Sequence, residues 1–110
     1  KTELLGYAAD LRWRREVGGI SVGGFQVATD DRSKLLLQGA RTAADANAAH
    51  TEGWKTSNGT WIDLDANTII ILSNAVREHV SECFARERLV ATKVGTGEIT
   101  SMAQVYAAFV

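Results

Sequence analysis

Apolar side chains recur every three or four residues in four stretches of the chain, a spacing that places them on one face of a helix. Residues able to cap a helix precede three of these stretches, and Gly18 and Gly19 follow the first. In the last stretch Ser101 and Gln104 match the capping-box pattern. The predicted helices are residues 1–17, from Asp30 or Asp31 to about Asn47, from Asp65 to about Ala91, and 99–110.

The first of two predicted β-hairpins lies between the first and second helices. Residues 20–22 and 25–27 alternate apolar and polar side chains around Gly23 and Gly24. Glycine accepts the positive φ angles of a two-residue hairpin turn. Such a turn pairs residues symmetrically, so all four apolar side chains of this hairpin are expected on one face, toward the core.

The second predicted hairpin precedes the third helix. Residues 54–57 and 60–64 flank Asn58 and Gly59, a pair that strongly favours a two-residue turn. By analogy with the first hairpin, the two aliphatic residues of its second strand are expected to face the core.

The opposite face of the second hairpin carries the candidate binding residues. The expected register places Trp54, Thr56 and Trp61 together on that face. Exposed tryptophan pairs are typical anchors of a protein interface or of a sugar-binding platform. The alternative is that the first helix covers this face through Trp13. Trp54, Trp61 and Thr56 are therefore the predicted contact residues.

Together these elements predict an α+β fold: an N-terminal helix, two β-hairpin–helix units and a short C-terminal helix, in a single domain of 110 residues. The two units cover residues 19–48 and 53–91. Shifting the sequence by 35 residues places Gly24 on Gly59, and helix caps and helix-core residues coincide in the same order. An internal duplication explains this order, with chance similarity as the alternative.

Composition and charge exclude several classes of protein. Twelve basic and thirteen acidic residues lack the basic surplus that nucleic-acid binding requires. Cys83 is the only cysteine, which excludes an internal disulfide and favours a reducing cytoplasm. Apolar runs such as residues 69–72 are far too short to span a membrane. Because the chain starts at Lys1, we expect a domain of a longer polypeptide.

Residues that could carry catalysis or hold a metal have simpler explanations. His79 and Cys83 lie four residues apart on the predicted long helix, but two ligands do not make a metal site. A cysteine nucleophile needs a base and an accessible, electropositive setting, which a mid-helix Cys83 lacks. Asp30 and Asp65 are explained as helix caps. We therefore expect no enzyme activity, no cofactor and no metal.

Three arginines cluster at the end of the first helix. Arg12, Arg14 and Arg15 surround Trp13, and cations at this position complement the helix dipole. We expect this cluster to be a solvated helix end.

An ordered set of residues runs through about two-thirds of the chain. Its members are Arg12, Glu16, Gly18, Gly19, Thr29, Asp30, Asp31, Arg32, Ser33, Leu36, Gly39, Ala40, Trp54, Lys55, Gly59, Leu64, Asp65, Ala66, Ala75, Val76, His79, Val80, Phe84 and Glu87. This set resembles a domain of uncharacterised function that recurs in tail and tail-fibre-associated proteins of tailed bacteriophages and prophages. The segment after Gly95 lies outside the matched pattern.

The resemblance implies a context and supplies no catalytic residues. It implies a non-catalytic structural or interaction module of a phage or prophage tail, acting in tail-fibre attachment or assembly. A tail-fibre assembly chaperone and a carbohydrate-binding module for host recognition are the alternatives. The expected partners are other phage tail or fibre proteins, with further copies of this chain as an alternative. The expected location is the host bacterial cytoplasm during assembly, or the virion tail.

Overall fold

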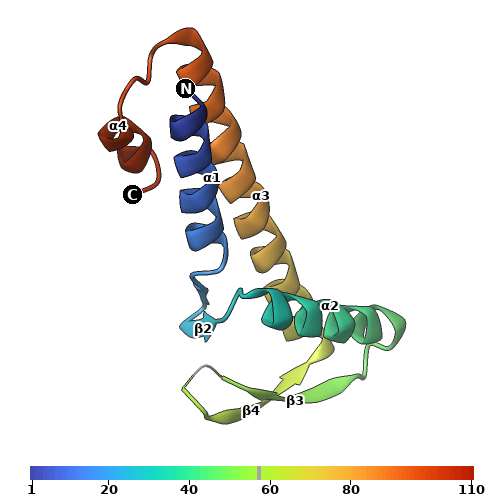
Figure 1. Ribbon diagram of the computed structural model, residues 1–110. Coiled ribbons are helices and arrows are strands. Elements are labelled where there is room, and N and C mark those ends of the chain that lie inside the picture. The colour runs from blue at the N-terminus through green and yellow to red at the C-terminus, as the bar shows by residue number, and fades with distance from the viewer. Residues whose placement is uncertain (57) are drawn as a thin grey trace. The chain divides into compact units, whose positions relative to one another are not determined.

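The computed structural model describes residues 1–56 and 58–110, which form two compact units (Figure 1). One unit contains residues 17–79, and the other contains residues 1–16 and 80–110. We call them the hairpin unit and the helical unit. The predicted element order is confirmed: an N-terminal helix, two hairpins each followed by a helix, and a short C-terminal helix. That residues 1–110 form a single domain stays a prediction.

The first hairpin of the hairpin unit has the predicted register. Strand β1 (Ile20–Val22) pairs with β2 (Phe25–Val27), with Ile20 opposite Val27. Gly23 and Gly24 both have positive φ, +55° and +88°, as a type I′ turn requires. Val27 is buried and Ile20 and Val22 pack against the core, as predicted, whereas Phe25 is 41% exposed.

Helix α2 (Asp31–Ala46) begins at a side-chain cap, as predicted. The Asp30 carboxylate accepts a hydrogen bond from the backbone amide of Ser33 at 3.3 Å. This bond satisfies one of the amides that the first turn of a helix leaves without an intrahelical partner. At the other end, the backbone amide of Asn47 donates to the Ala43 carbonyl. The predicted end near Asn47 is therefore confirmed.

The second hairpin differs from the prediction by one residue in register. Strand β3 (Thr51–Lys55) pairs with β4 (Trp61–Asp65), so Trp54 lies opposite Ile62 and Lys55 lies opposite Trp61. The Thr56 amide donates to the Thr60 carbonyl at 2.8 Å, a pairing that a two-residue turn does not allow. The predicted strand residue Ser57 lies outside the described residues.

This register corrects the predicted face of the tryptophans. Directly opposite residues of an antiparallel pair share a face, so Trp54 shares the core-facing side with Ile62. Trp61 shares the other side with Lys55. The prediction that both tryptophans lie on one face was wrong, because a one-residue slip moves every side chain of a strand to the other face.

Helix α3 (Ala66–Thr96) is capped by Asp65, whose carboxylate accepts from the Thr68 amide at 2.8 Å. The predicted end at about Ala91 was wrong. The helix continues to Thr96 because its buried face extends through Val94, and it stops before Gly97, whose φ is +84°. No helix in the described parts of the chain is both long and apolar enough to cross a bilayer.

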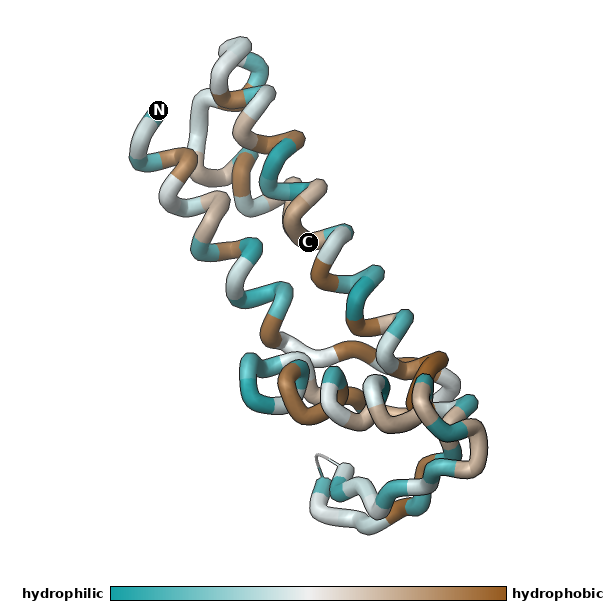
Figure 2. The backbone as a smooth tube through the Cα atoms, turned by 90° about the vertical axis from the view of Figure 1, so that its right-hand side faces the viewer, coloured by the Kyte–Doolittle hydropathy of each residue, from teal (hydrophilic) through white to brown (hydrophobic). Residues whose placement is uncertain are grey.

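The core of the hairpin unit lies between its hairpins, α2 and the first turns of α3. Apolar residues recur turn by turn along α3 in the hydropathy colouring of Figure 2. Ile69 and Leu37 are among the buried residues at the centre, and Trp54 and Ile62 pack against them. The Arg41 guanidinium also donates to the Asn74 side chain at 2.8 Å, which links α2 to α3.

The helical unit consists of α1 (Thr2–Glu16), the C-terminal part of α3, and α4 (Met102–Ala107). The capping box at the start of α4 is confirmed: Ser101 accepts from the Gln104 amide, and the Gln104 side chain accepts from the Ser101 amide. Only part of the predicted apolar stripe is buried, with Val105 fully enclosed and Tyr106 half exposed. The buried core residues of this unit are Ala8, Leu11, Val90, Val94, Ile99, Val105 and Phe109.

Candidate functional site

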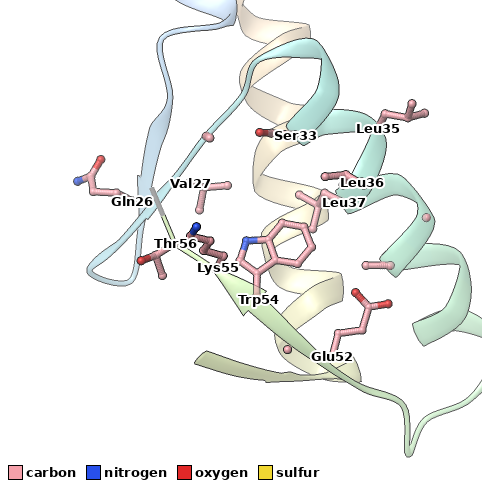
Figure 3. A pocket seen from close by; sticks show the side chains of 14 residues that line it. Gln26, Val27, Ser33, Leu35, Leu36, Leu37, Glu52, Trp54, Lys55 and Thr56 are labelled. Carbon is pink, nitrogen blue, oxygen red and sulfur yellow. The ribbon is translucent and has the colours of Figure 1, made fainter. Parts of the chain in front are cut away.

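A hollow of about 590 Å³ opens in the hairpin unit between α2, β2 and β3 (Figure 3). We call it the groove. It is lined by residues 26–28, by one side of α2 and by residues 52–56. Its volume falls within the range of about 300–1,000 Å³ that is typical of binding pockets.

Trp54 forms the central apolar side chain of the groove. Its indole points from β3 toward Leu36 and Leu37 on α2 (Figure 3). The observed register places it there, because Glu52, Trp54 and Thr56 alternate toward the same side of the hairpin. All three side chains are half-buried, whereas the intervening residues are exposed.

Two leucines on α2 leave apolar surface accessible at the groove. Leu35 is 72% exposed and Leu36 is 51% exposed, and both line the groove. Gly39 lies one turn further along α2, where a Cβ atom would meet nothing within 4 Å. Exposed apolar side chains gathered around a concavity mark a binding site more often than scattered ones do.

A smaller hollow of about 240 Å³ continues the groove between the tips of the two hairpins. Gln26 and Thr56 line both hollows. The added walls are Phe25 at the end of the first hairpin and Asn58 and Thr60 at the end of the second. The concavity therefore runs past residues 52–56, with β2 also lining it.

The three predicted contact residues do not lie together. Trp54 and Thr56 both line the groove. Trp61 lies on the opposite face of the second hairpin and is 70% exposed, with the Lys55 ammonium 6.0 Å from its ring centroid. The alternative that Trp13 covers the tryptophans concerns the placement of the two units and stays a prediction. Leu35 and Leu36 were missed as site residues, because helical periodicity alone does not show which apolar residues of a helix stay uncovered.

The carboxylates considered for acid–base work serve as caps. The hydroxyl and the amide of Ser33 donate to Asp30 and lower the pKa of its carboxyl group below the ordinary 3.8. Hydrogen bonds from the Thr68 side chain and amide lower the pKa of Asp65 in the same way. A general base at neutral pH needs the opposite shift. Helix capping is therefore the chemistry that these two groups are set up for.

Cys83 lies in α3 and is fully buried. Burial, followed by the charge of Glu82, raises the pKa of its thiol. The thiol is therefore protonated at neutral pH, which disfavours a role as nucleophile. His79 lies one turn earlier in the same helix.

Arg12 in the helical unit is part of an ion-pair network that the sequence did not predict. Its guanidinium donates to Glu16 and to Glu87, each at 2.8 Å, and lies 4.3 Å from the centroid of the Phe84 ring. The hydrogen bond to Glu87 contributes most to raising the pKa of Arg12 above its ordinary value. The Arg12 side chain is only 18% exposed, so the prediction of a solvated helix end was wrong for this residue.

Two further arginines hold the end of α4. Arg15 donates to the carbonyl of Phe109 at 3.3 Å, and Arg86 donates to the carbonyl of Ala108 at 3.2 Å. Both also contact the carboxylate of Glu82. Burial alone would raise the pKa of Glu82, but the Arg86 hydrogen bond and the charges of both arginines outweigh it, so the pKa lies below 4.5. Cations at the C-terminal carbonyls of a helix are stabilising.

The fold and the groove define a small α+β chain whose hairpin unit has a partly apolar groove between α2, β2 and β3. The family described as Domain of unknown function (DUF4376) matches residues 1–109, and the chain belongs to that family. Comparison with curated proteins and with solved structures gave no match. The match includes the segment after Gly95, so the expectation that this segment lies outside the family pattern was wrong.

Proposed function

We propose that this chain is a non-catalytic interaction module of a phage or prophage tail, acting in tail-fibre attachment or assembly. The groove, with Trp54 at its centre, is the proposed contact surface. The observation that carries the proposal is the accessible apolar surface of Leu35 and Leu36 beside Trp54. The phage context rests on the resemblance of the residue pattern and not on the groove.

The size and composition of the groove suit a protein partner. Aromatic anchors in partly enclosed pockets supply much of the binding energy of protein interfaces. Burying one exposed leucine contributes about 1.5–3 kcal/mol before the costs of association. Leu35, Leu36 and Trp54 together thus provide enough apolar surface for a small hot spot.

The two alternative functions differ in what they require of the chain. A tail-fibre assembly chaperone would use the same groove but would be absent from the finished particle, so a protein inventory of purified particles separates it from a structural module. A carbohydrate platform built on two tryptophans requires both on one face, and Trp54 and Trp61 lie on opposite faces. The exposed Trp61 alone is a weaker platform.

The test uses the chain co-expressed with phage tail and tail-fibre proteins as candidate partners. Complex formation is measured by size-exclusion chromatography with light scattering. Leu36→Glu and Trp54→Ala are expected to weaken the complex at least about tenfold. The matched control is Leu89→Glu, because Leu89 is an equally exposed helical leucine (56%) of the helical unit. A complex that survives both groove substitutions, or that none of these proteins forms, would reject the proposal.

A further inference from the structure

The outer edge of β3 has no strand partner within the described residues. β3 and β4 form a two-stranded sheet, so each strand pairs along one edge only. Hydrogen-bonded pairs alternate with non-hydrogen-bonded pairs in an antiparallel ladder. Because Thr56 and Thr60 form a hydrogen-bonded pair, the amide and carbonyl groups of Thr51, Gly53 and Lys55 point away from β4. This edge borders the groove, since the consecutive residues 52–56 line it.

The outer edge of β2 faces the same groove. β1 and β2 also form a separate two-stranded sheet, and residues 26–28 line the groove opposite β3. Across the two-residue turn Val22 and Phe25 form a hydrogen-bonded pair, so the amide and carbonyl of Gln26 point away from β1. Within the described residues, the groove is therefore bordered by two strand edges, of β3 and β2, whose outward hydrogen-bonding groups have no strand partner.

The β3 edge has only part of the protection that exposed strand edges usually carry. Proteins commonly protect such edges with proline, a bulge or charged side chains, especially lysine. The central residue of this edge is Gly53, and a Cβ atom built there would meet nothing within 4 Å. Glu52 and Lys55 are the two charged residues of β3, and the Glu52 carboxylate lies 3.0 Å from the His50 ring nitrogen. A backbone can therefore approach this edge closely.

We propose that the groove binds an extended peptide segment of a partner protein by β-strand addition to the edge of β3. The occupant is a strand with apolar side chains at alternate positions. The side chains on one face of this strand pack against the apolar surface formed by Trp54 and Leu36. Its backbone forms hydrogen bonds with the outward amide and carbonyl groups of Gly53 and Lys55. This inference rests on the proposed function and specifies how the groove binds its partner.

An extended peptide fits these features better than a helix or a second copy of the chain. A helix satisfies its own backbone groups and would leave both strand edges unused. A second copy would have to bring its own hairpin, with both strands, between β2 and β3. A single strand can bond to the outward groups of β3 along its length.

The first experiment measures amide hydrogen exchange of the isotopically labelled chain by nuclear magnetic resonance. The probes are synthetic peptides Lys-Thr-Val-Thr-X-Thr-Val-Thr-Lys, with X as Val, Leu, Ile, Phe or Trp, at about 1 mM. A peptide of the same composition without the alternation is the control. Saturating peptide is expected to slow exchange of the Gly53 and Lys55 amides at least about tenfold. The outward amides of Trp61 and Asp63 on β4 should not change. No binding by any member, or binding without protection of Gly53 and Lys55, would overturn the inference.

The second experiment compares two proline variants, each of which removes one backbone amide donor from one outer edge of the second hairpin. Gly53→Pro removes an outward amide of β3 and leaves the ladder to β4 intact. Asp63→Pro makes the equivalent change directly opposite, on the outer edge of β4. Gly53→Pro is expected to weaken peptide binding at least about tenfold, and Asp63→Pro less than about twofold. Equal effects of the two substitutions in folded protein would contradict strand addition.

The outcomes separate this inference from the proposed function. If Trp54→Ala and Leu36→Glu disrupt the complex with a tail protein while Gly53→Pro does not, the groove binds its partner but not through the strand edge. If none of the three changes affects that complex, both the inference and the proposed contact surface are wrong. Self-association that Gly53→Pro abolishes would identify the occupant as a second copy and would also overturn the inference.

Discussion

Replacing Arg12 by methionine should destabilise the helical unit far more than the same change at Arg14. Arg12 donates to two carboxylates, Glu16 and Glu87, each at 2.8 Å, and stacks on Phe84. Arg14 pairs with a single carboxylate and is 70% exposed. Both residues are arginines of α1, and each pairs with an acidic residue four positions away in the sequence. They therefore differ mainly in burial and in the number of contacts.

The expected cost at Arg12 is about 2–4 kcal/mol. A hydrogen bond to a charged group contributes about 1.5–3 kcal/mol when shielded from water, and partial exposure lowers this value. A cation–π contact on a half-exposed ring adds about 0.5–1 kcal/mol. The exposed pair at Arg14 should contribute only about 0.3–0.5 kcal/mol. Lysine at position 12 should recover part of the loss, because it keeps the charge but cannot bridge both carboxylates as a guanidinium does.

The assay is urea unfolding followed by far-ultraviolet circular dichroism, with all variants at one pH and salt concentration. A thermal melt gives a second measure of the same difference. If Arg12→Met costs no more than Arg14→Met, the two hydrogen bonds and the ring contact do not stabilise the fold, and the reasoning from burial is refuted.

Three further predictions follow from single positions. Val105→Ala should cost about 1–3 kcal/mol in urea unfolding, because the side chain is completely buried beneath α4; no loss would mean that α4 does not contribute to the core. The pKa of Glu82 is lowered in the folded state. Its ionised carboxylate therefore contributes fully to the free energy of unfolding above pH 4.5, and this contribution is lost as the pH falls through the folded pKa. Glu82→Gln should therefore flatten the acid side of the stability profile, and an unchanged profile would contradict this. Gly39→Ala should raise the free energy of unfolding by about 0.5–1 kcal/mol, because a Cβ atom there meets nothing within 4 Å. Gly97→Ala should lower the free energy of unfolding by about 1–2 kcal/mol, because the φ of Gly97 is +84°. Effects of equal sign would contradict the reasoning from backbone conformation.

The elements that the sequence predicted well are those set by local chemistry. An aspartate three residues before a free amide caps a helix wherever it occurs, so Asp30 and Asp65 marked the starts of α2 and α3. Two glycines at positive φ fixed the first hairpin. The short helix α4 followed from its capping box in the same way. None of these predictions needed to know which segments lie side by side in space.

The contacts that the sequence did not predict join residues far apart along the chain. Arg12 and Glu87 are separated by 75 positions, and nothing local distinguishes Arg12 from the solvated Arg14 two residues later. The groove likewise needs residues 26–28, the exposed side of α2 and residues 52–56 in one place. Helical periodicity placed Leu36 on an apolar stripe but could not show which part of that stripe would stay uncovered.

The second hairpin shows how one local detail decides the candidate site. Shifted by 35 residues, the two helices agree at two adjacent positions: Leu37 and Leu72 are buried, while Leu36 and Ile71 are each 51% exposed. They differ at the preceding position, where Leu35 is 72% exposed and Ile70 packs against the core. The hairpins that precede them do not agree. A register like that of the first hairpin would pair Lys55 with Ile62, as Ile20 pairs with Val27.

The observed slip of one residue instead pairs Trp54 with Ile62 and turns Lys55 outward. The inward position at the groove therefore carries an indole in place of an ammonium group, and the unpaired edge of β3 is centred on a glycine. An ammonium group there would carry a charge into the apolar wall formed with Leu36, at a large desolvation cost. The candidate binding surface thus depends on a feature in which the two hairpins differ, the pairing beyond Lys55. The duplication stays a prediction, but the dependence of the groove on this register does not require it.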